Sequence, residues 1–237
     1  NNIGRVHYVL SDYEKATAVF SKALEIRCQL FGCKSIDVEV TMLNTAQAYH
    51  KTGELDEAMR LYQNFIELIC CRLGPNNPDT VTAYKGMGRI YLERNDLPNA
   101  RSMLLEALKS EQAALGNSHT QLSSTINEIG SLCYKMNDLT AALNYFQQGL
   151  NIQKTSLDLN KKNIVVTLQN IAHIQRRNCN YSEATKAYNQ AKMLQIQVHG
   201  KCSLEVASAN VNVGLMQYEL TDYMSSLALY KEALLVR

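Results

Sequence analysis

The side chains of this 237-residue chain that could carry catalysis or hold a metal are few and isolated from one another. Zinc sites need histidine or cysteine ligands in pairs at short spacing, but no such pair occurs among the five histidines. A phosphate-binding loop and a dinucleotide-binding fingerprint are also absent from the sequence. The sequence therefore predicts a protein that is not an enzyme and uses no metal or cofactor. The five histidines are His7, His50, His119, His173 and His199.

Cysteine is the one reactive residue type that is frequent, with seven copies scattered over the chain. An odd number, in a chain long enough to form a core without disulfides, favours a reducing, cytoplasmic compartment. The adjacent Cys70 and Cys71 allow a redox interpretation. However, Cys28 and Cys70 occupy equivalent positions of a 42-residue repeat, which favours partly buried thiols instead.

The charge balance indicates no nucleic acid or membrane partner. Lysine and arginine number 24 against 22 aspartates and glutamates, and no block of like charge stands out. No uncharged apolar stretch is long enough to cross a membrane, and the N-terminus lacks the pattern of a signal peptide.

The elements that position all these side chains belong to the repeat of 42 residues. Two columns of small residues and one of bulky residues recur in this register, and a period of this length is typical of a solenoid. The bulky column follows one small column by four residues, so both lie on the same face of a helix. The small columns are Gly4, Ala46, Gly88, Gly130, Ala172 and Gly214, and Ala16, Ala58, Ala100, Ala142, Ala184 and Ser226; the bulky column is Phe20, Tyr62, Leu104, Phe146, Tyr188 and Tyr230.

Turn residues predict two antiparallel helices in each unit. Aspartate or asparagine at 12, 96, 138, 180 and 222 is suited to cap the second helix, and Asn180 with Glu183 fits a capping box. Glycine at 32, 74, 116 and 200, with Asp158 as the exception, is expected to end that helix in the left-handed conformation. Asn77 followed by Pro78 is expected to start the next helix.

We therefore predict an all-α, right-handed superhelical solenoid of about six units. Their ranges are 1–32, which is incomplete, 33–74, 75–116, 117–158, 159–200 and 201–237. Leu227, Tyr230 and Leu234 keep the apolar columns in the last helix. Because solenoid ends normally carry a polar cap, we expect further helices or a partner there.

The stretches "AQAYHKTGELDEAMRLYQNFI" (46–66) and "GRIYLERNDLPNARSMLLEAL" (88–108) resemble the tetratricopeptide repeat. The 42-residue length and "LGPNNPDTV" (73–81) are similar to the repeats of kinesin light chain. Residues 155–163, "TSLDLNKKN", depart from this pattern. The resemblance implies that the first helix of each pair lines a concave groove that binds a protein partner. The basic groups of the carboxylate clamp found in chaperone-binding members are replaced here by Thr82 and Gly86.

On that predicted face, the position two residues before the first small column is asparagine in four of six units, with Gly86 and Glu128 as departures. A carboxamide both donates and accepts, so such a ladder can bind the backbone of an extended peptide. Alternatively, these asparagines face water or bond to adjacent turns. The candidate peptide-binding residues are Asn2, Arg5, Asn44, Gln47, His50, Lys51, Lys85, Arg89, Tyr134, Asn170, His173, Arg176, Asn212 and Tyr218.

Basic residues outnumber acidic ones on this face, which favours an acidic or C-terminal peptide, although a solvated face of mixed charge has the same composition. Two functions follow as hypotheses. The first is a scaffold or adaptor that binds an extended segment of a partner protein. The second is a structural or regulatory module that packs against fixed neighbours in a larger assembly or in its own chain.

Overall fold

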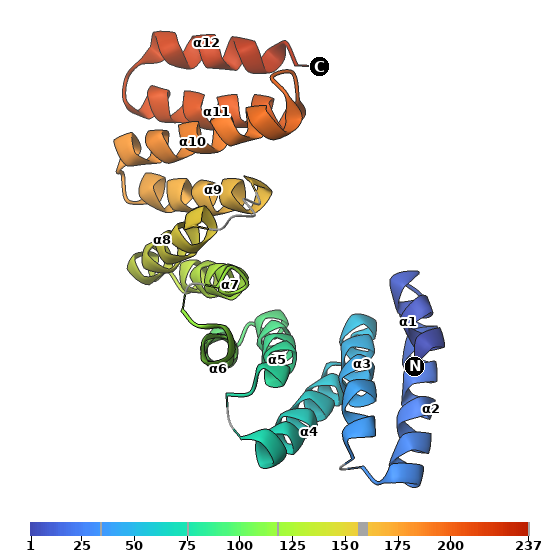
Figure 1. Cartoon of the computed structure of the whole chain (residues 1–237). Helices are drawn as coiled ribbons and strands as arrows, with labels where there is room; N and C mark the ends of the chain where they lie inside the picture. The colour runs from blue at the N-terminus through green and yellow to red at the C-terminus, as the bar shows by residue number, and fades with distance from the viewer. Residues whose placement is uncertain (34, 75, 118, 156–160, 237) are drawn as a thin grey trace. The chain divides into compact units, whose positions relative to one another are not determined.

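A computed structural model describes residues 1–33, 35–74, 76–117, 119–155 and 161–236. Within these ranges the chain is all-α, with twelve α-helices, one 3₁₀ turn and no strand (Figure 1). It divides into two compact units, Asn1–Asn117 and Ser118–Arg237. No helix of the described residues is long and apolar enough to cross a membrane.

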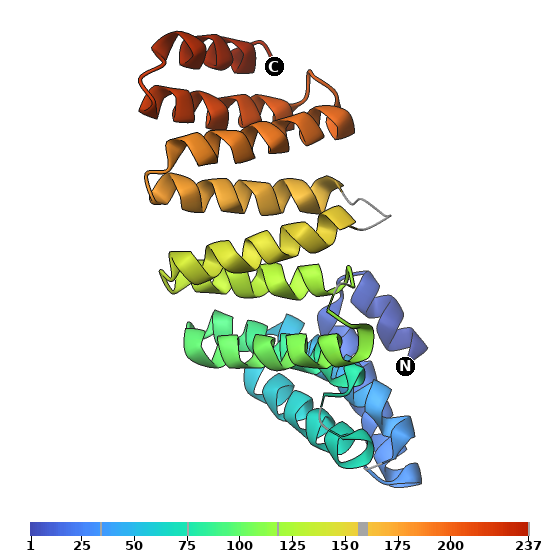
Figure 2. The same ribbon diagram turned by 60° about the vertical axis from the view of Figure 1, so that its left-hand side comes forward.

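Each unit is a stack of helix pairs in which every helix packs against the next one along the chain. In addition, the first helices of successive pairs touch, α3 with α5 and α7 with α9. Unit 1 contains α1 (Asn2–Val9), α2 (Tyr13–Phe31), α3 (Ile36–Thr52), α4 (Leu55–Leu73), the 3₁₀ turn η1 (Pro78–Thr80), α5 (Val81–Glu93) and α6 (Leu97–Leu115). Unit 2 contains α7 (Leu122–Lys135), α8 (Leu139–Thr155), α9 (Lys161–Arg177), α10 (Tyr181–His199), α11 (Leu204–Glu219) and α12 (Tyr223–Leu234), stacked in chain order (Figure 2).

The small and bulky columns form the contact between the two helices of a pair, as the repeat predicts. Phe146 packs on Gly130, where a Cβ atom would lie 3.2 Å from three ring carbons. Phe20 packs in the same way on Gly4, and Tyr230 on Gly214. Glycine in the small column therefore lets an aromatic ring approach the backbone of the facing helix.

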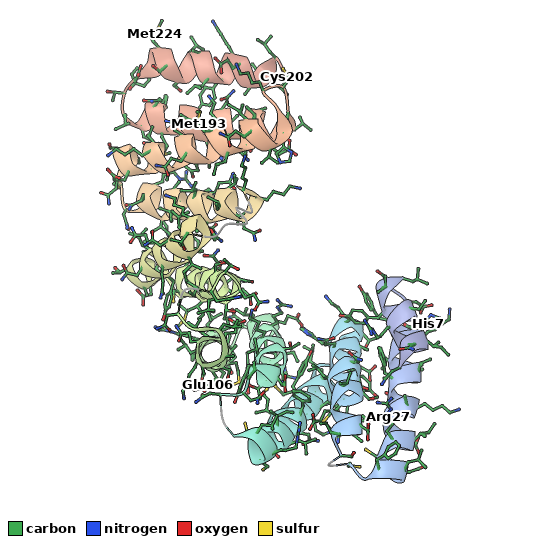
Figure 3. The ribbon with its side chains drawn as sticks, viewed as in Figure 1. His7, Arg27, Glu106, Met193, Cys202 and Met224 are labelled. Atoms are coloured by element: carbon green, nitrogen blue, oxygen red, sulfur yellow. The ribbon has the colours of Figure 1, made fainter. Side chains whose placement is uncertain are left out.

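Polar contacts join one helix pair to the next pair along the chain. Arg27 of α2, labelled in Figure 3, donates to the carbonyl oxygen of Asp37 at 2.6 Å and to Oγ1 of Thr41 at 3.0 Å, both at α3. A guanidinium can reach both acceptors because it presents several N–H groups in a rigid plane. The side chain thereby ties the second helix of one pair to the first helix of the next.

Most of the predicted helix starts are confirmed. The carboxylates of Asp12, Asp96, Asp138 and Asp222 accept hydrogen bonds from backbone N–H groups of the first turn, at 3.0 to 3.4 Å. Asn77 accepts from the backbone N–H of Asp79 at 2.9 Å, but the turn that it caps is the 3₁₀ turn η1 rather than the first turn of α5.

The predicted capping box at Asn180 is wrong. Asn180 is the N-cap residue of α10, but its side chain accepts no hydrogen bond from the first turn. Its amide donates to Oε1 of Gln175 at 3.0 Å instead, and Glu183 pairs with Lys186 at 2.6 Å. Other partners within reach thus take both side chains away from the backbone.

The glycines at the ends of the second helices have positive φ, but not the left-handed α conformation that we expected. At Gly32, Gly74, Gly116 and Gly200, φ lies between 77° and 85° while ψ lies between 144° and 168°. This region is open essentially to glycine alone, so the requirement for glycine is stricter than at an ordinary helix end. Asp158 and the divergent loop around it lie outside the described residues.

A second turn position with positive φ recurs in all six repeats, just before the N-cap of each second helix. Only one of these residues is glycine, Gly53, and one is the β-branched Thr221 with a φ of 64°. The others are Ser11, Asn95, Asn137 and Cys179. The sequence does not reveal this conformation, because asparagine alone among these side chains is common at positive φ.

Candidate functional site

The first helices of unit 1 share a cavity of about 650 Å³. α1, α3 and α5 contribute most of its lining, with one ring from α4. Five of the candidate residues line it together. The lining consists of Tyr8, Gln47, His50, Lys51, Tyr62, Thr82, Lys85, Gly86, Arg89, Leu92 and Glu93.

A smaller cavity of about 300 Å³ in the same unit is lined by Arg5, Tyr8, Val9, Phe20, Val40, Asn44 and Gln47. Each of these residues, moved by one repeat, lands on a residue of the larger cavity. For example, Phe20 corresponds to Tyr62, and Asn44 to Gly86. The repeat therefore builds the same kind of pocket twice. The smaller one is lined mainly by uncharged side chains, whereas the larger one holds several charges.

Tyr62 explains why the asparagine column is interrupted at Gly86. A Cβ atom at residue 86 would come within hard contact of the Tyr62 ring and hydroxyl. Tyr62 is almost fully buried, and this burial raises the pKa of its phenol. The tyrosine thus occupies the space that an asparagine would need.

Three of the four column asparagines are partly exposed, and their carboxamides make no hydrogen bond with a described residue. These are Asn44, Asn170 and Asn212. None of them is among the buried amides that lack a partner. Asn2 is exposed in the first turn of α1. The carboxamides of Asn44, Asn170 and Asn212 are therefore not used in hydrogen bonds to the described turns and helices.

Two basic side chains of the larger cavity are paired with carboxylates of neighbouring residues. Nε2 of His50 lies 2.9 Å from Oε1 of Glu93, which joins α3 to α5. Nζ of Lys85 lies 3.1 Å from Oε1 of Glu111 on α6, and both side chains are largely buried, at 18% and 9% exposure. These pairs lower the positive charge that the sequence suggests for the pocket, and they give Lys85 a role in packing.

Replacing Lys85 by methionine is expected to destabilise the protein by about 3 kcal/mol, because the Glu111 carboxylate stays buried without the ammonium. The second change Glu111→Leu should restore most of this loss, because an apolar pair can replace a buried ion pair. Urea unfolding of the two variants measures both effects. A Lys85→Met variant as stable as the original chain would show that the pair contributes nothing to folding.

In unit 2 the candidates Tyr134, His173 and Arg176 gather around α9, together with Arg177 and Tyr188. The guanidinium carbon of Arg177 lies 5.3 Å from the ring centre of Tyr134 on α7. The hydroxyl of Tyr188 on α10 lies 3.1 Å from Nδ1 of His173, with the two rings edge to face at 5.7 Å. Partial desolvation and the neighbouring charge of Arg176 lower the pKa of His173.

Tyr218 lies apart from this cluster as an exposed side chain on α11, edge to face with Tyr223 at 5.3 Å. The structure thus separates the candidates into a unit 1 pocket and a unit 2 cluster.

The repeat pattern assigns Tyr62 and Tyr188 to the packing column alone. The hydroxyl groups of these two tyrosines were the signal in the sequence that they could belong to a site, because buried tyrosine hydroxyls normally need a hydrogen-bond partner.

No group of three histidine, cysteine, aspartate or glutamate side chains in the described parts of the chain is arranged to hold a metal ion. The cluster at α9 and the unit 1 cavity instead contain phenols and basic side chains. Such groups bind peptides and anions by hydrogen bonds and charge.

Comparisons with known proteins agree on the repeat type. The tetratricopeptide repeat family profile matches residues 1–68 and 79–155. A search of curated protein sequences found no match. Among solved structures, this chain is similar to BtubC (BKLC) from P. vanneervenii, with 16% identity, coverage of 95% of this chain and 91% of that chain, and a TM-score of 0.76.

Two further structures extend this likeness in fold. The nearly identical TPR-like repeats of a kinesin light chain-type protein from Podosopora anserina have 15% identity, with 84% of this chain and 94% of that chain covered and a TM-score of 0.71. YrrB, a TPR protein described as having an unusual peptide-binding site, has 20% identity, with 92% of each chain covered and a TM-score of 0.60.

Proposed function

This chain belongs to the tetratricopeptide repeat family, and we propose that it is an adaptor that binds an extended segment of a partner protein on its first-helix faces. The family fold implies a scaffold for protein–protein interaction. YrrB, which shares the fold, is described by its peptide-binding site. Our proposal goes beyond this general role in two respects: the partner segment binds in an extended conformation, and the side chains that bind it are specified.

The observation that carries this proposal is the set of free carboxamides at Asn44, Asn170 and Asn212. A partly exposed amide without a hydrogen-bond partner among the described residues is available to a ligand, and it can pair with both the N–H and the C=O of an extended backbone. Asn44 lines the smaller of the two unit 1 pockets, Gln47 lines both, and the pockets offer space for side chains of such a segment.

An acidic character of the segment is part of the proposal. Among the described residues, Arg5, Lys51, Arg176 and Arg177 have no carboxylate within ion-pair distance, although His50 and Lys85 do. Opposite charge on the partner would speed its association and help to set its orientation.

A cytoplasmic location is likewise proposed. All seven cysteines are free thiols, and unpaired thiols persist in a reducing compartment.

An alternative function is a module packed against fixed neighbours. The exposed apolar side chains of α12, among them Met224 and Leu234, favour this alternative. Exposed apolar groups of this size are suited to permanent contacts.

The test of the groove is the double substitution Asn170→Ala and Asn212→Ala. Partners are captured from a lysate, their shared segment is delimited, and its synthetic peptide is titrated by fluorescence polarisation. We expect the affinity to fall by about 2 kcal/mol, or ~30-fold, because several peptide hydrogen bonds are lost. The melting temperature should stay nearly unchanged, because the two amides make no hydrogen bond to a described residue of the chain.

The matched control is Asn144→Ala with Asn189→Ala, two exposed asparagines on the second helices α8 and α10. This variant should bind the peptide like the original chain. Equal affinity of the ladder variant and the control would rule out the groove and favour the packing module. Unfolding of the ladder variant would mean that these amides belong to the packing.

A further inference from the structure

Several residues that line the larger pocket of unit 1 have counterparts in unit 2, three repeats later in the sequence. The phenols Tyr8 and Tyr62 correspond to Tyr134 and Tyr188, and His50 and Lys51 correspond to Arg176 and Arg177. The repeat therefore presents two phenols and two basic side chains at equivalent positions in each unit. The identities differ in one respect, since both cations of unit 2 are arginines.

The unit 2 group is held in place by contacts from three helices. Arg177 lies over the Tyr134 ring at 5.3 Å, and Tyr188 is bonded to His173 at 3.1 Å. Arg176 and Arg177 follow His173 by three and four residues on α9. This spacing places all three side chains on neighbouring rows of one helix face. A cation that stacks on a ring loses little freedom when a ligand binds.

The charge of the two groups differs. In unit 1, Nε2 of His50 lies 2.9 Å from the carboxylate of Glu93. In unit 2, the corresponding Arg176 makes no ion pair with Glu219, the equivalent of Glu93, and neither arginine has a carboxylate partner in the part of the chain that is described. Unit 2 thus carries two adjacent arginines on α9, neither of them in an ion pair with a described carboxylate.

The remaining donors of the cluster also point to an anion. Since His173 has a lowered pKa, its imidazole is neutral near pH 7. The hydrogen bond to the Tyr188 hydroxyl occupies Nδ1, which leaves Nε2 as the ring nitrogen that can bond to a ligand. The Tyr134 hydroxyl adds a further donor. This set exceeds the two oxygens of a carboxylate, but it suits the three terminal oxygens and the double charge of a phosphoryl group.

We propose that the cluster of Tyr134, His173, Arg176, Arg177 and Tyr188 is a phosphoryl-binding site that reads a phosphorylated residue of the partner segment. The reading of a partner residue rests on the proposed function, whereas binding of the anion itself does not. We do not expect this preference in unit 1, because its equivalent residues are a histidine paired with a carboxylate and a single lysine.

The probe that tests this site is inorganic phosphate. Sodium phosphate and sodium acetate are titrated separately into the whole chain at pH 7.5 and constant ionic strength, and the arginine Nε–Hε resonances are followed by NMR. We expect saturable shifts of Arg176 and Arg177 with phosphate at concentrations at least 10-fold lower than with acetate. Arg176→Gln with Arg177→Gln should weaken phosphate binding at least 10-fold.

The control for total charge is Lys154→Gln with Lys192→Gln on α8 and α10, which removes the same charge from unit 2 and should leave phosphate binding unchanged. Equal responses to phosphate and acetate would overturn the proposal, as would equal weakening by the lysine control. The ladder variant Asn170→Ala with Asn212→Ala should bind phosphate normally. Loss of phosphate binding and loss of groove binding can therefore be told apart.

Discussion

Replacing Phe146 by alanine is expected to lower the free energy of unfolding by about 4 kcal/mol, a large fraction of the net stability of a typical domain. The ring is 1% exposed and lies against Gly130, where no side chain can move in to fill the space. The cost therefore combines the lost burial of the ring with an open cavity between α7 and α8. Urea unfolding followed by circular dichroism measures this change.

Because repeat proteins are stabilised by contacts between neighbours, the effect should also be local. Amide hydrogen exchange is expected to speed up in α7 and α8 more than in α2. Phe31→Ala is the matched control, since that ring is 56% exposed at the end of α2, and it should cost less than about 1 kcal/mol. A similar loss in both variants would show that the Phe146 ring does not lock its helix pair.

The second large effect is expected at Gly86, where the change to asparagine restores the interrupted column. We expect a loss of about 2 to 3 kcal/mol, since the new side chain must displace the buried ring of Tyr62. Thr82→Asn, on the same helix and exposed, is the control and should change stability by less than about 1 kcal/mol.

A double-mutant cycle with Tyr62→Ala identifies the cause. In that background the ring is gone, so Gly86→Asn should cost at least about 1 kcal/mol less than in the original chain. Equal costs in both backgrounds would mean that the clash is not what excludes asparagine. In that case the intrinsic flexibility of glycine or another contact of α5 would have to account for the residue.

Much of the fold could be predicted because its determinants are local and repeated. Aspartates 12, 96, 138 and 222 cap helices through bonds within three residues, and the glycines at 32, 74, 116 and 200 end them through backbone conformation. The prediction failed where a local rule competed with other partners. Asn180 has the residue type of a cap, but Gln175 lies close enough to take its amide.

The candidate site was predictable only as a helix face. The 42-residue register shows which residues share that face, and it led to the asparagine column and to the residues that line the unit 1 cavities. It does not show where a long side chain ends, because that depends on rotamers and on neighbours from other helices.

The sequence by itself therefore determined the repeat, the helix pairs and the faces that carry the asparagines and cations, since periodicity and caps act over a few residues. Only the tertiary structure decided that Lys85 pairs with Glu111, that Tyr62 fills the place of an asparagine, and that Arg177 stacks on Tyr134. Each of these contacts joins residues from different helices. Their geometry is set by how closely the helices pack, a property that no single stretch of sequence contains.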